Sequence, residues 1–157
     1  MTSEQLDVRS ELSMCPADRP EQWDGVRVEG MVDAPQHISL QELSDMPQTE
    51  SVQDLRCHDG WVAPGQRWEG VALSDVLVRA GYSEDAGFVV ASCLNTQRVL
   101  PLGEALATGT MLALQLNSQP LPEGHGGPCR LVAAGKTGPH FVKWPERIEV
   151  MRESPEG

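Results

Sequence analysis

A cysteine with basic neighbours stands at the end of a strand-like segment, in the run Leu55-Arg-Cys-His-Asp-Gly-Trp61. A cysteine that ends a strand and opens a glycine-containing loop can present its sulfur to a cavity. Arg56 and His58 could favour the thiolate of Cys57, the form that attacks electrophiles and binds metals. Strand alternation turns both basic side chains away from that sulfur, so a structural core cysteine explains the same run. Cys57 is a candidate nucleophile or metal ligand, with the structural role as its alternative.

A second candidate is the glycine-rich run Pro120-Leu-Pro-Glu-Gly-His-Gly-Gly-Pro-Cys-Arg130. Its paired glycines could bring backbone N–H groups close to an anion. His125 and Arg130 flank them, and both could donate hydrogen bonds to a phosphate. A tight turn between two strands, with His125 in solvent, explains the same residues.

Both lysines of the chain, Lys136 and Lys143, lie in the run from Ala134 to Trp144. The Gly-Lys-Thr within it is no P-loop, because that pattern requires a glycine where Arg130 stands and a helix afterwards. A lysine kept where lysine is otherwise avoided is a candidate for a specific anion contact. Two solvated surface lysines are the alternative.

Composition narrows the class of protein. The chain has 157 residues and carries 23 Asp and Glu against 12 Lys and Arg, a formal net charge of −11. Such a surface repels nucleic acid and anionic lipid, which disfavours partners of either kind. No apolar run approaches the ~18 residues of a membrane span, and the polar start Met1–Arg9 lacks a secretory signal. We therefore expect a cytoplasmic protein, whose acidic and lysine-poor surface fits either a high-salt cytoplasm or an ordinary acidic protein.

The cysteines and histidines show no zinc-finger spacing, and no C-x-x-C occurs. Without an export signal, disulfides are not expected. Cys93 and Cys129 are each predicted to be a small buried hydrophobe. Joint metal binding by Cys57 and His58 is disfavoured, because adjacent strand residues seldom converge on one ion.

The elements that must position these residues are mostly short strands. Strands are predicted at 23–32, 52–57, 88–92, 111–116, 130–134 and 141–151, and another strand is predicted to end at 99–100. Short helices are predicted after the capping box Ser39-Leu-Gln-Glu42, over 71–80 before Gly81, and over 102–107 after Pro101. Residues 58–66 are predicted to form a loop. Without a βαβ rhythm, the pattern predicts an α+β, mostly β domain over 23–152, after a flexible leader (1–22) and before a tail (153–157).

In order and spacing, these segments resemble the molybdopterin-binding domain of the sulfite oxidase family, from about Trp23 to Met151. The resemblance is carried by five runs, which are Trp23-Asp-Gly-Val-Arg-Val-Glu-Gly30, Leu40 to Pro47, Cys57-His-Asp-Gly-Trp61 with Trp68-Glu-Gly-Val71, Leu116 to Arg130, and Gly138 to Trp144. It implies a sulfite-oxidase-type fold with mixed sheets and a few short helices. It also implies a molybdopterin-dependent oxidoreductase that transfers an oxygen atom to or from a small-molecule substrate, with a redox partner protein.

The resemblance also implies roles for particular residues. Cys57 falls on the cysteine whose thiolate binds molybdenum. The cofactor, a molybdenum-pyranopterin that carries a phosphate, would be held by His125, Arg130, Phe141, Val142 and Lys143. In an acidic protein, these cations would have to gather locally to hold it.

The sequence departs from the family pattern in two places. Glu11–Pro20 lacks the Arg-Asn-His-type segment that contacts the cofactor in many members, and Ser92-Cys-Leu-Asn-Thr-Gln-Arg98 lacks their substrate-side tyrosine. Sulfite specificity is therefore not carried over. A silent binding or carrier module that keeps the fold is the alternative function, because fold does not dictate function.

Overall fold

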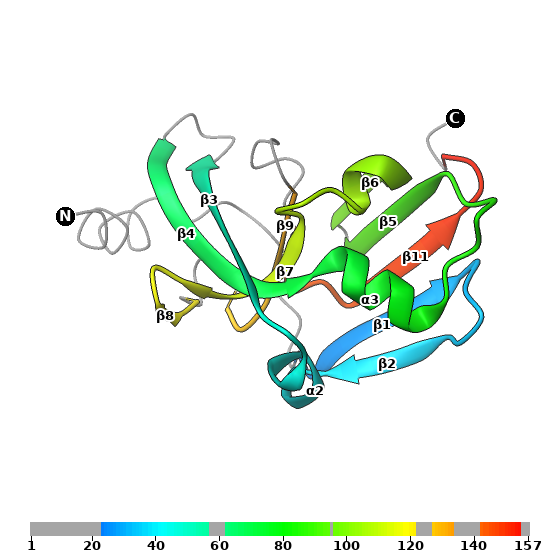
Figure 1. The fold of residues 1–157 in the computed structure, drawn as a ribbon, viewed down its shortest axis with the longest axis horizontal. Helices are drawn as coiled ribbons and strands as arrows, with labels where there is room; N and C mark the ends of the chain where they lie inside the picture. The colour runs from blue at the N-terminus through cyan, green and yellow to red at the C-terminus, as the bar shows by residue number, and fades with distance from the viewer. Residues whose placement is uncertain (1–22, 57–61, 95, 122–126, 134–141, 155–157) are drawn as a thin grey trace.

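The computed structural model describes residues 23–56, 62–94, 96–121, 127–133 and 142–154 (Figure 1). The predicted leader (1–22) lies outside these residues. The first sheet has the strand order β2-β1-β11-β5-β6 and consists of β1 (Gly25–Gly30), β2 (Gln36–Ser39), β5 (Phe88–Cys93), β6 (Thr96–Pro101) and β11 (Arg147–Met151). Its β1–β11 pair is parallel, and its other pairs are antiparallel.

The second sheet is antiparallel and has the order β10-β9-β7-β4-β3, with β8 paired to β7. Its strands are β3 (Thr49–Arg56), β4 (Val62–Ala72), β7 (Met111–Leu116), β8 (Gln119–Pro120), β9 (Arg130–Val132) and β10 (Val142–Lys143). Figure 1 shows β3 and β4 as a long hairpin that extends away from the first sheet. The mixed sheets confirm the predicted α+β, mostly β fold.

Three short helices complete the described fold: α2 (Leu40–Asp45), α3 (Leu73–Ala80) and α4 (Leu102–Ala105). The predicted capping box is present, because Ser39 Oγ accepts from Glu42 N and Glu42 Oε1 accepts from Ser39 N. Gly81 ends α3 in the left-handed conformation, with a φ of 73°. None of these helices is long and apolar enough to cross a membrane, within the part of the chain that the structure describes.

The second sheet has two faces, and the strand register shows which residues lie on each of them. Leu112 pairs with Leu131, and both belong to the main core between the sheets. Met111 pairs with Val132 on the opposite face, where both belong to a smaller cluster around Trp68. We call this second surface the Trp68 face. Because Ala113 of the same cluster pairs with Arg130, strand alternation places the Arg130 side chain on the Trp68 face.

The structure corrects the predicted loop over 58–66. β4 begins at Val62, so Pro64 and Gly65 lie within a strand. They are accommodated by a β-bulge, because the β3–β4 register shifts between Gln53 and Leu55. Gly65 N donates to Asp54 Oδ1 at 3.0 Å.

The predicted single strand over 141–151 is also wrong. β10 ends at Lys143 and β11 begins at Arg147. Trp144 takes a φ of 52°, outside the range of a strand, and Pro145 has no N–H to give to a ladder. The break lets the chain leave one sheet and enter the other.

Candidate functional site

Two cations stand opposite each other on neighbouring strands. Lys143 of β10 pairs in register with Arg130 of β9. Arg130 is 2% exposed and Lys143 is 7% exposed. Burial lowers the pKa of Arg130 to about 9. Burial and the neighbouring charge of Arg130 lower the pKa of Lys143 to about 8. Such a pair of buried positive groups favours an anionic ligand, whose charge would offset their repulsion.

Each of the two cations lies over an aromatic ring. The Arg130 guanidinium carbon lies 5.5 Å from the centre of the Trp68 ring, and Lys143 Nζ lies 5.9 Å from the centre of the Trp144 ring. Both distances are within the range of a cation–π contact. The rings therefore stabilise the charged forms that burial disfavours.

Trp68 is itself fixed by the hairpin that carries it. Its Nε1 donates to the backbone oxygen of Gln53 on β3 at 3.2 Å. The Gln53 side chain donates to the backbone oxygen of Gly109 at 2.9 Å, just before β7. This connection links β3 to the residue before β7. It also fixes the position of the Trp68 ring, over which Arg130 lies.

Trp144 links the two glycine-rich segments that the sequence singled out. Its Nε1 donates to Gly127 O at 2.8 Å, and its backbone N donates to Cys129 O at 2.9 Å. The left-handed backbone at Trp144 is thus held by contacts on both sides of Pro128. The start of β9, and with it Arg130, is positioned against β10 in this way.

The structure brings together Arg130 and Lys143 of the predicted site. The Val142 side chain lies in the main core, on the other face of β10 from Lys143. Cys57, His125 and Phe141 lie outside the described residues. Within the described ranges, no group of three or more His, Cys, Asp and Glu side chains could hold a metal ion.

Cys93 and Cys129 are both buried, as predicted. Burial raises the pKa of the Cys129 thiol far above its usual value. A buried neutral thiol is a poor nucleophile and a poor metal ligand, so Cys129 acts as a small hydrophobe.

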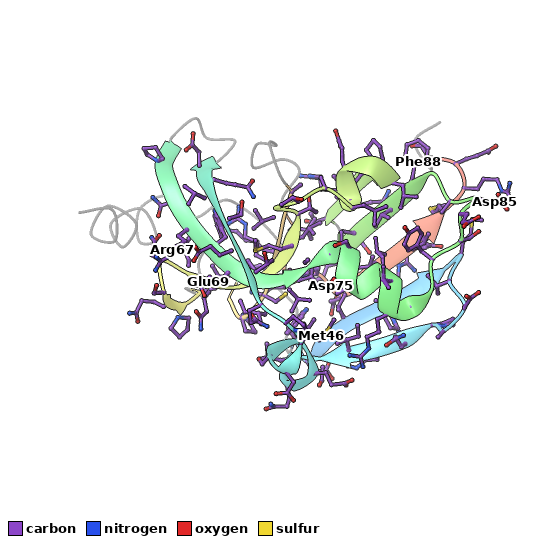
Figure 2. The ribbon with its side chains drawn as sticks, in the orientation of Figure 1. Met46, Arg67, Glu69, Asp75, Asp85 and Phe88 are labelled. Atoms are coloured by element: carbon purple, nitrogen blue, oxygen red, sulfur yellow. The ribbon has the colours of Figure 1, made fainter. Side chains whose placement is uncertain are left out.

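The surface arginines have carboxylate partners. Arg67 lies 3.6 Å from Glu50 and 3.9 Å from Glu69, and Figure 2 shows Arg67 and Glu69 near each other on β4. Ion pairs of the same kind are formed by Arg27, Arg79, Arg147 and Arg152. Exposed pairs contribute little stability, about 0–1 kcal/mol each. They do show that, on a surface with many carboxylates, these arginines form ion pairs with carboxylates.

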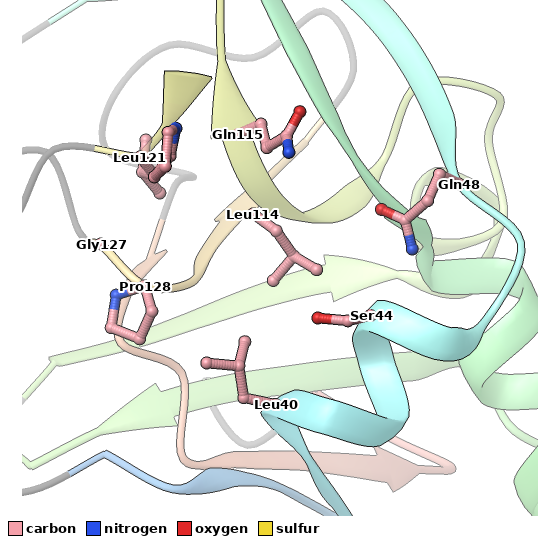
Figure 3. Close-up of a pocket in the computed structure, with 9 residues that line it drawn as sticks. Leu40, Ser44, Gln48, Leu114, Gln115, Leu121, Gly127 and Pro128 are labelled. Atoms are coloured by element: carbon pink, nitrogen blue, oxygen red, sulfur yellow. The ribbon is translucent and has the colours of Figure 1, made fainter. Parts of the chain in front are cut away.

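A cavity of about 580 Å³ lies between α2, β7, β8 and the Gly127-Pro128 turn (Figure 3). Its lining is mostly apolar and uncharged, and consists of Leu40, Ser44, Gln48, Leu114, Gln115, Pro120, Leu121, Gly127 and Pro128. In Figure 3 the Ser44 hydroxyl points toward Leu114, while the Gln48 amide nitrogen is held by Leu43 O and Met46 O. Neither Arg130 nor Lys143 lines this cavity, so it is distinct from the cation pair.

The sequence interpretation missed Trp68 as part of the site and named it only within a family motif. The available signal was alternation, because Gln66, Trp68 and Gly70 are spaced by two along β4 and all three are buried. A buried polar Gln66 beside a tryptophan indicates a face that is not simply core. Gln66 Oε1 accepts from Asn117 Nδ2 at 2.8 Å.

Comparison with known proteins identifies the family. Residues 13–157 match the family described as "Oxidoreductase molybdopterin binding domain". The chain is 33% identical to the uncharacterized oxidoreductase YuiH of Bacillus subtilis (strain 168), over 86% of this chain and 68% of that protein. It is 34% identical to human mitochondrial sulfite oxidase, over 70% of this chain and 22% of that protein.

A third relative agrees with this result, and a solved structure shares the fold. The chain is 31% identical to the protein-methionine-sulfoxide reductase catalytic subunit MsrP of Xanthomonas campestris, over 83% of this chain and 46% of MsrP. The crystal structure of the sulfane dehydrogenase SoxCD from Paracoccus pantotrophus shares the fold with a TM-score of 0.80 at 23% identity, over 90% of this chain and 41% of that one.

The fold and these matches define an oxidoreductase-type molybdopterin-binding domain. The chain belongs to the oxidoreductase molybdopterin-binding domain family, and the predicted resemblance is confirmed. Molybdopterin is the cofactor that this family description names. The chain spans less than half of the length of sulfite oxidase, MsrP and the SoxCD chain.

The described residues fit a cofactor that carries a phosphate. Arg130 and Lys143 lie side by side, and both are buried and positively charged at neutral pH, since their pKa values are about 9 and about 8. A phosphate placed between them would relieve their repulsion and replace the water that burial removes. In a chain with a net charge of −11, such a site needs local cations, and β9 and β10 supply them.

Proposed function

We propose that this chain is a molybdopterin-dependent oxidoreductase that performs two-electron oxygen-atom transfer on a small molecule. The observation that carries the proposal is the buried Arg130–Lys143 pair in a member of a molybdopterin-binding family. When bound, the cofactor would supply the oxygen-atom transfer itself. The chain's own residues would bind and orient it.

Each predicted residue has a role in this proposal. The thiolate of Cys57 would bind molybdenum, because a thiolate is a soft ligand that suits this metal. Arg130 and Lys143 would hold the phosphate, together with His125. Val142 would contribute through its backbone, because its side chain belongs to the core. Phe141, which precedes it in the chain, would contact the pterin.

The test is metal analysis of protein made in a host that synthesises the cofactor. We expect about one molybdenum per chain, with the fluorescence of oxidised pterin in the same fraction. Cys57→Ser should abolish turnover and leave the far-UV spectrum unchanged. Cys93→Ser is the matched control, because Cys93 is buried at the end of β5, and it should retain molybdenum.

The opposite result would favour the alternative function. Absence of both molybdenum and pterin after expression in a competent host would reject the oxidoreductase and support a silent binding or carrier module. Zinc without pterin, lost in a Cys57 and His58 double variant, would support a simple metal site instead. A chain that binds cofactor but turns over no small molecule would support a carrier.

The cellular location and the partners of the protein are also proposals. We propose that the protein works in the cytoplasm with a redox partner protein and without nucleic acid or membrane. The net charge of −11 supports both exclusions, since such a surface repels polyanions. Fractionation of cells that express the tagged full chain would test the location. Recovery in the membrane or periplasmic fraction would contradict it.

A further inference from the structure

The first sheet has one face on the main core and a second face, which we call the outer face. The main core contains Val26 and Val28 of β1 and Ile148 and Val150 of β11. Because side chains alternate along a strand, the residues between them point to the outer face. Within the described ranges, the three helices and the second sheet also place buried residues in the main core, and α3 contacts β1 from that side (Figure 1). These elements therefore leave the outer face uncovered.

Charged side chains form two rows across the outer face. The parallel register of β1 and β11 sets Arg27 beside Arg147, which we call the arginine row. It also sets Glu29 beside Glu149, the glutamate row. Like charges side by side on neighbouring strands are unfavourable, so each row favours opposite charges placed against it. The charges of the two rows sum to zero, although the chain as a whole carries −11.

Each arginine already reaches one glutamate of its own strand. Arg27 Nε lies 3.4 Å from Glu29 Oε1, and Arg147 Nη2 lies 3.3 Å from Glu149 Oε1. The side chains of Arg27 and Arg147 are 63% and 41% exposed, so another molecule can approach them. A guanidinium has five N–H donors and can bind a second carboxylate while it keeps the first.

The two rows are complementary to a second copy of themselves. In a face-to-face dimer, the two-fold axis lies between the two sheets and runs parallel to them. An axis along the strands would set arginine row against arginine row. An axis across the strands, passing between the rows, sets each arginine row against the glutamate row of the other copy. Arg27 then faces the partner's Glu29, and Arg147 faces the partner's Glu149.

The size of the face sets the strength of such a contact. The sheet has five strands of up to six residues, so the face measures about 24 Å by about 20 Å at ~4.8 Å per strand and ~3.3 Å per residue. Two such faces would bury roughly 950 Å² in total, which is typical of weak and reversible complexes. Apolar contact would come from the partly buried Phe88, Val99 and Met151 on the same face.

We propose that the outer face of the first sheet is the interface of a weak two-fold dimer of this chain. Two copies with a net charge of −11 repel each other over most of their surface, and a neutral face with complementary rows is where they can meet. The outer face lies across the main core from the Trp68 face, so the Arg130–Lys143 pair stays accessible. Dimerisation involves no residue of the cofactor site and is independent of the proposed function.

The test is sedimentation equilibrium of the full chain over a wide range of protein concentration. In about 0.15 M salt the Debye length is about 8 Å, so distant charges are screened and contacting pairs are not. We expect a reversible equilibrium between monomer and dimer. Arg147→Glu should weaken dimerisation at least tenfold, about 1.4 kcal/mol, because it sets a carboxylate against the partner's Glu149. Glu149→Arg should weaken it similarly, because it sets two guanidinium groups against each other.

A mixture of these two variants tests the facing of the rows. In a mixed dimer, both carboxylates of the Arg147→Glu copy face guanidinium groups of the Glu149→Arg copy. The equimolar mixture should therefore dimerise about as well as the unchanged protein, although each variant alone does not. If a β11 variant does not fold, Arg27→Glu and Glu29→Arg repeat the same test on β1.

Arg79→Glu is the matched control. The Arg79 side chain is 39% exposed on α3, close to the 41% of Arg147, and its guanidinium lies 2.9 Å from Glu42. This variant makes the same change in net charge away from the outer face, so it should dimerise as the unchanged protein does. The inference would be overturned by a monomer at every concentration, by equal dimerisation of folded Arg147→Glu and Arg79→Glu, or by a mixture that stays monomeric.

Discussion

Lys143 stands directly opposite Arg130 across the β9–β10 pair, with both side chains buried on the Trp68 face. Two like charges in register destabilise a sheet unless something compensates them. Part of the compensation is aromatic, from Trp68 and Trp144. An anionic ligand would add to it in the role that we assign to this site. In the cofactor-free protein, the buried pair makes stability depend on pH.

The first prediction concerns that pH dependence. The pKa of Lys143 is about 8 in the folded protein, below its ordinary value of 10.5. Between these values the unfolded chain binds a proton that the folded chain does not. Stability should therefore rise as the pH increases from about 8 to about 10.5, and below about 8 this contribution should stay constant. Burial of Arg130 acts in the same direction above about 9.

Urea unfolding of the cofactor-free protein at pH 7.5 to 10 would measure this effect. Lys143→Met removes the titrating group and keeps a side chain of similar length, so its unfolding midpoint should depend less on pH. Orthophosphate should also reduce the dependence, because a bound anion raises the pKa of Lys143 again. A slope that is the same in both proteins would show that Lys143 does not carry the effect.

The second prediction concerns Trp68. Trp68→Phe removes the indole N–H that donates to Gln53 O and leaves an aromatic ring near Arg130. We expect the free energy of unfolding to fall by about 1–3 kcal/mol, from the lost hydrogen bond and the smaller ring. Orthophosphate binding should weaken as well, because phenylalanine gives a weaker cation–π contact than tryptophan.

Trp23→Phe is the comparison variant, because the Trp23 indole also donates to a backbone oxygen, that of Pro145, at 2.7 Å. No cation lies over Trp23 in the described structure. It should lose stability without losing phosphate affinity. Denaturant unfolding and calorimetry of both variants would check the difference, and equal phosphate affinities would remove Trp68 from the site.

Local signals in the sequence predicted much of the fold. The capping box at Ser39 placed α2, and Gly81 placed the end of α3, because both act through hydrogen bonds within a few residues. The break after Lys143 was missed, because the turn at Trp144 depends on Gly127 and Cys129 from a distant segment. Pro64 lies in a strand although its sequence predicts a loop, because its bulge depends on the register with β3.

In the candidate site too, the residues could be predicted from the sequence, whereas their contacts could not. Arg130 and Lys143 were found because cations are rare in this acidic chain and the family pattern marks them. That they lie opposite each other follows only from the pairing of β9 and β10, which no local signal encodes. Tertiary pairing decides these contacts, and a single sequence does not display it.

The third prediction concerns the helix that borders the cavity. Ser39→Ala removes the side-chain oxygen that accepts from Glu42 N, and we expect a loss of about 1 kcal/mol of stability. The backbone N–H of Ser39, its side chain and Arg79 all lower the pKa of Glu42. Ser39→Ala keeps the backbone N–H and removes the side-chain contribution, so the variant should raise that pKa by part of the shift. Ser44→Ala lies on the same helix and makes no capping contact, so its stability should change less. Thermal unfolding would rank the two variants, and the reverse order would contradict the capping role.

The fourth prediction concerns the glycine two residues after Trp68. A Cβ added at Gly70 would meet Leu112 O and the backbone of Ala113, where β7 pairs with β4. Backbone atoms of a central strand cannot move aside as a flexible side chain can, so Gly70→Ala should force β4 and β7 apart. We expect a loss of more than about 3 kcal/mol, in the range of severe core substitutions. Because β7 pairs with β9, the displacement should also misplace Arg130 and weaken phosphate binding.

Gly103→Ala provides the control for that substitution. Gly103 lies in α4, and an added Cβ meets no atom within 4 Å. Alanine favours a helix over glycine by about 0.5–1 kcal/mol, so this variant should be as stable as the unchanged protein or slightly more so. Denaturant unfolding and calorimetry with orthophosphate would test both variants together. A Gly70→Ala protein that unfolds at the same denaturant concentration as Gly103→Ala would mean that β4 and β7 do not pack as closely as described, and that the position of Arg130 does not depend on their contact.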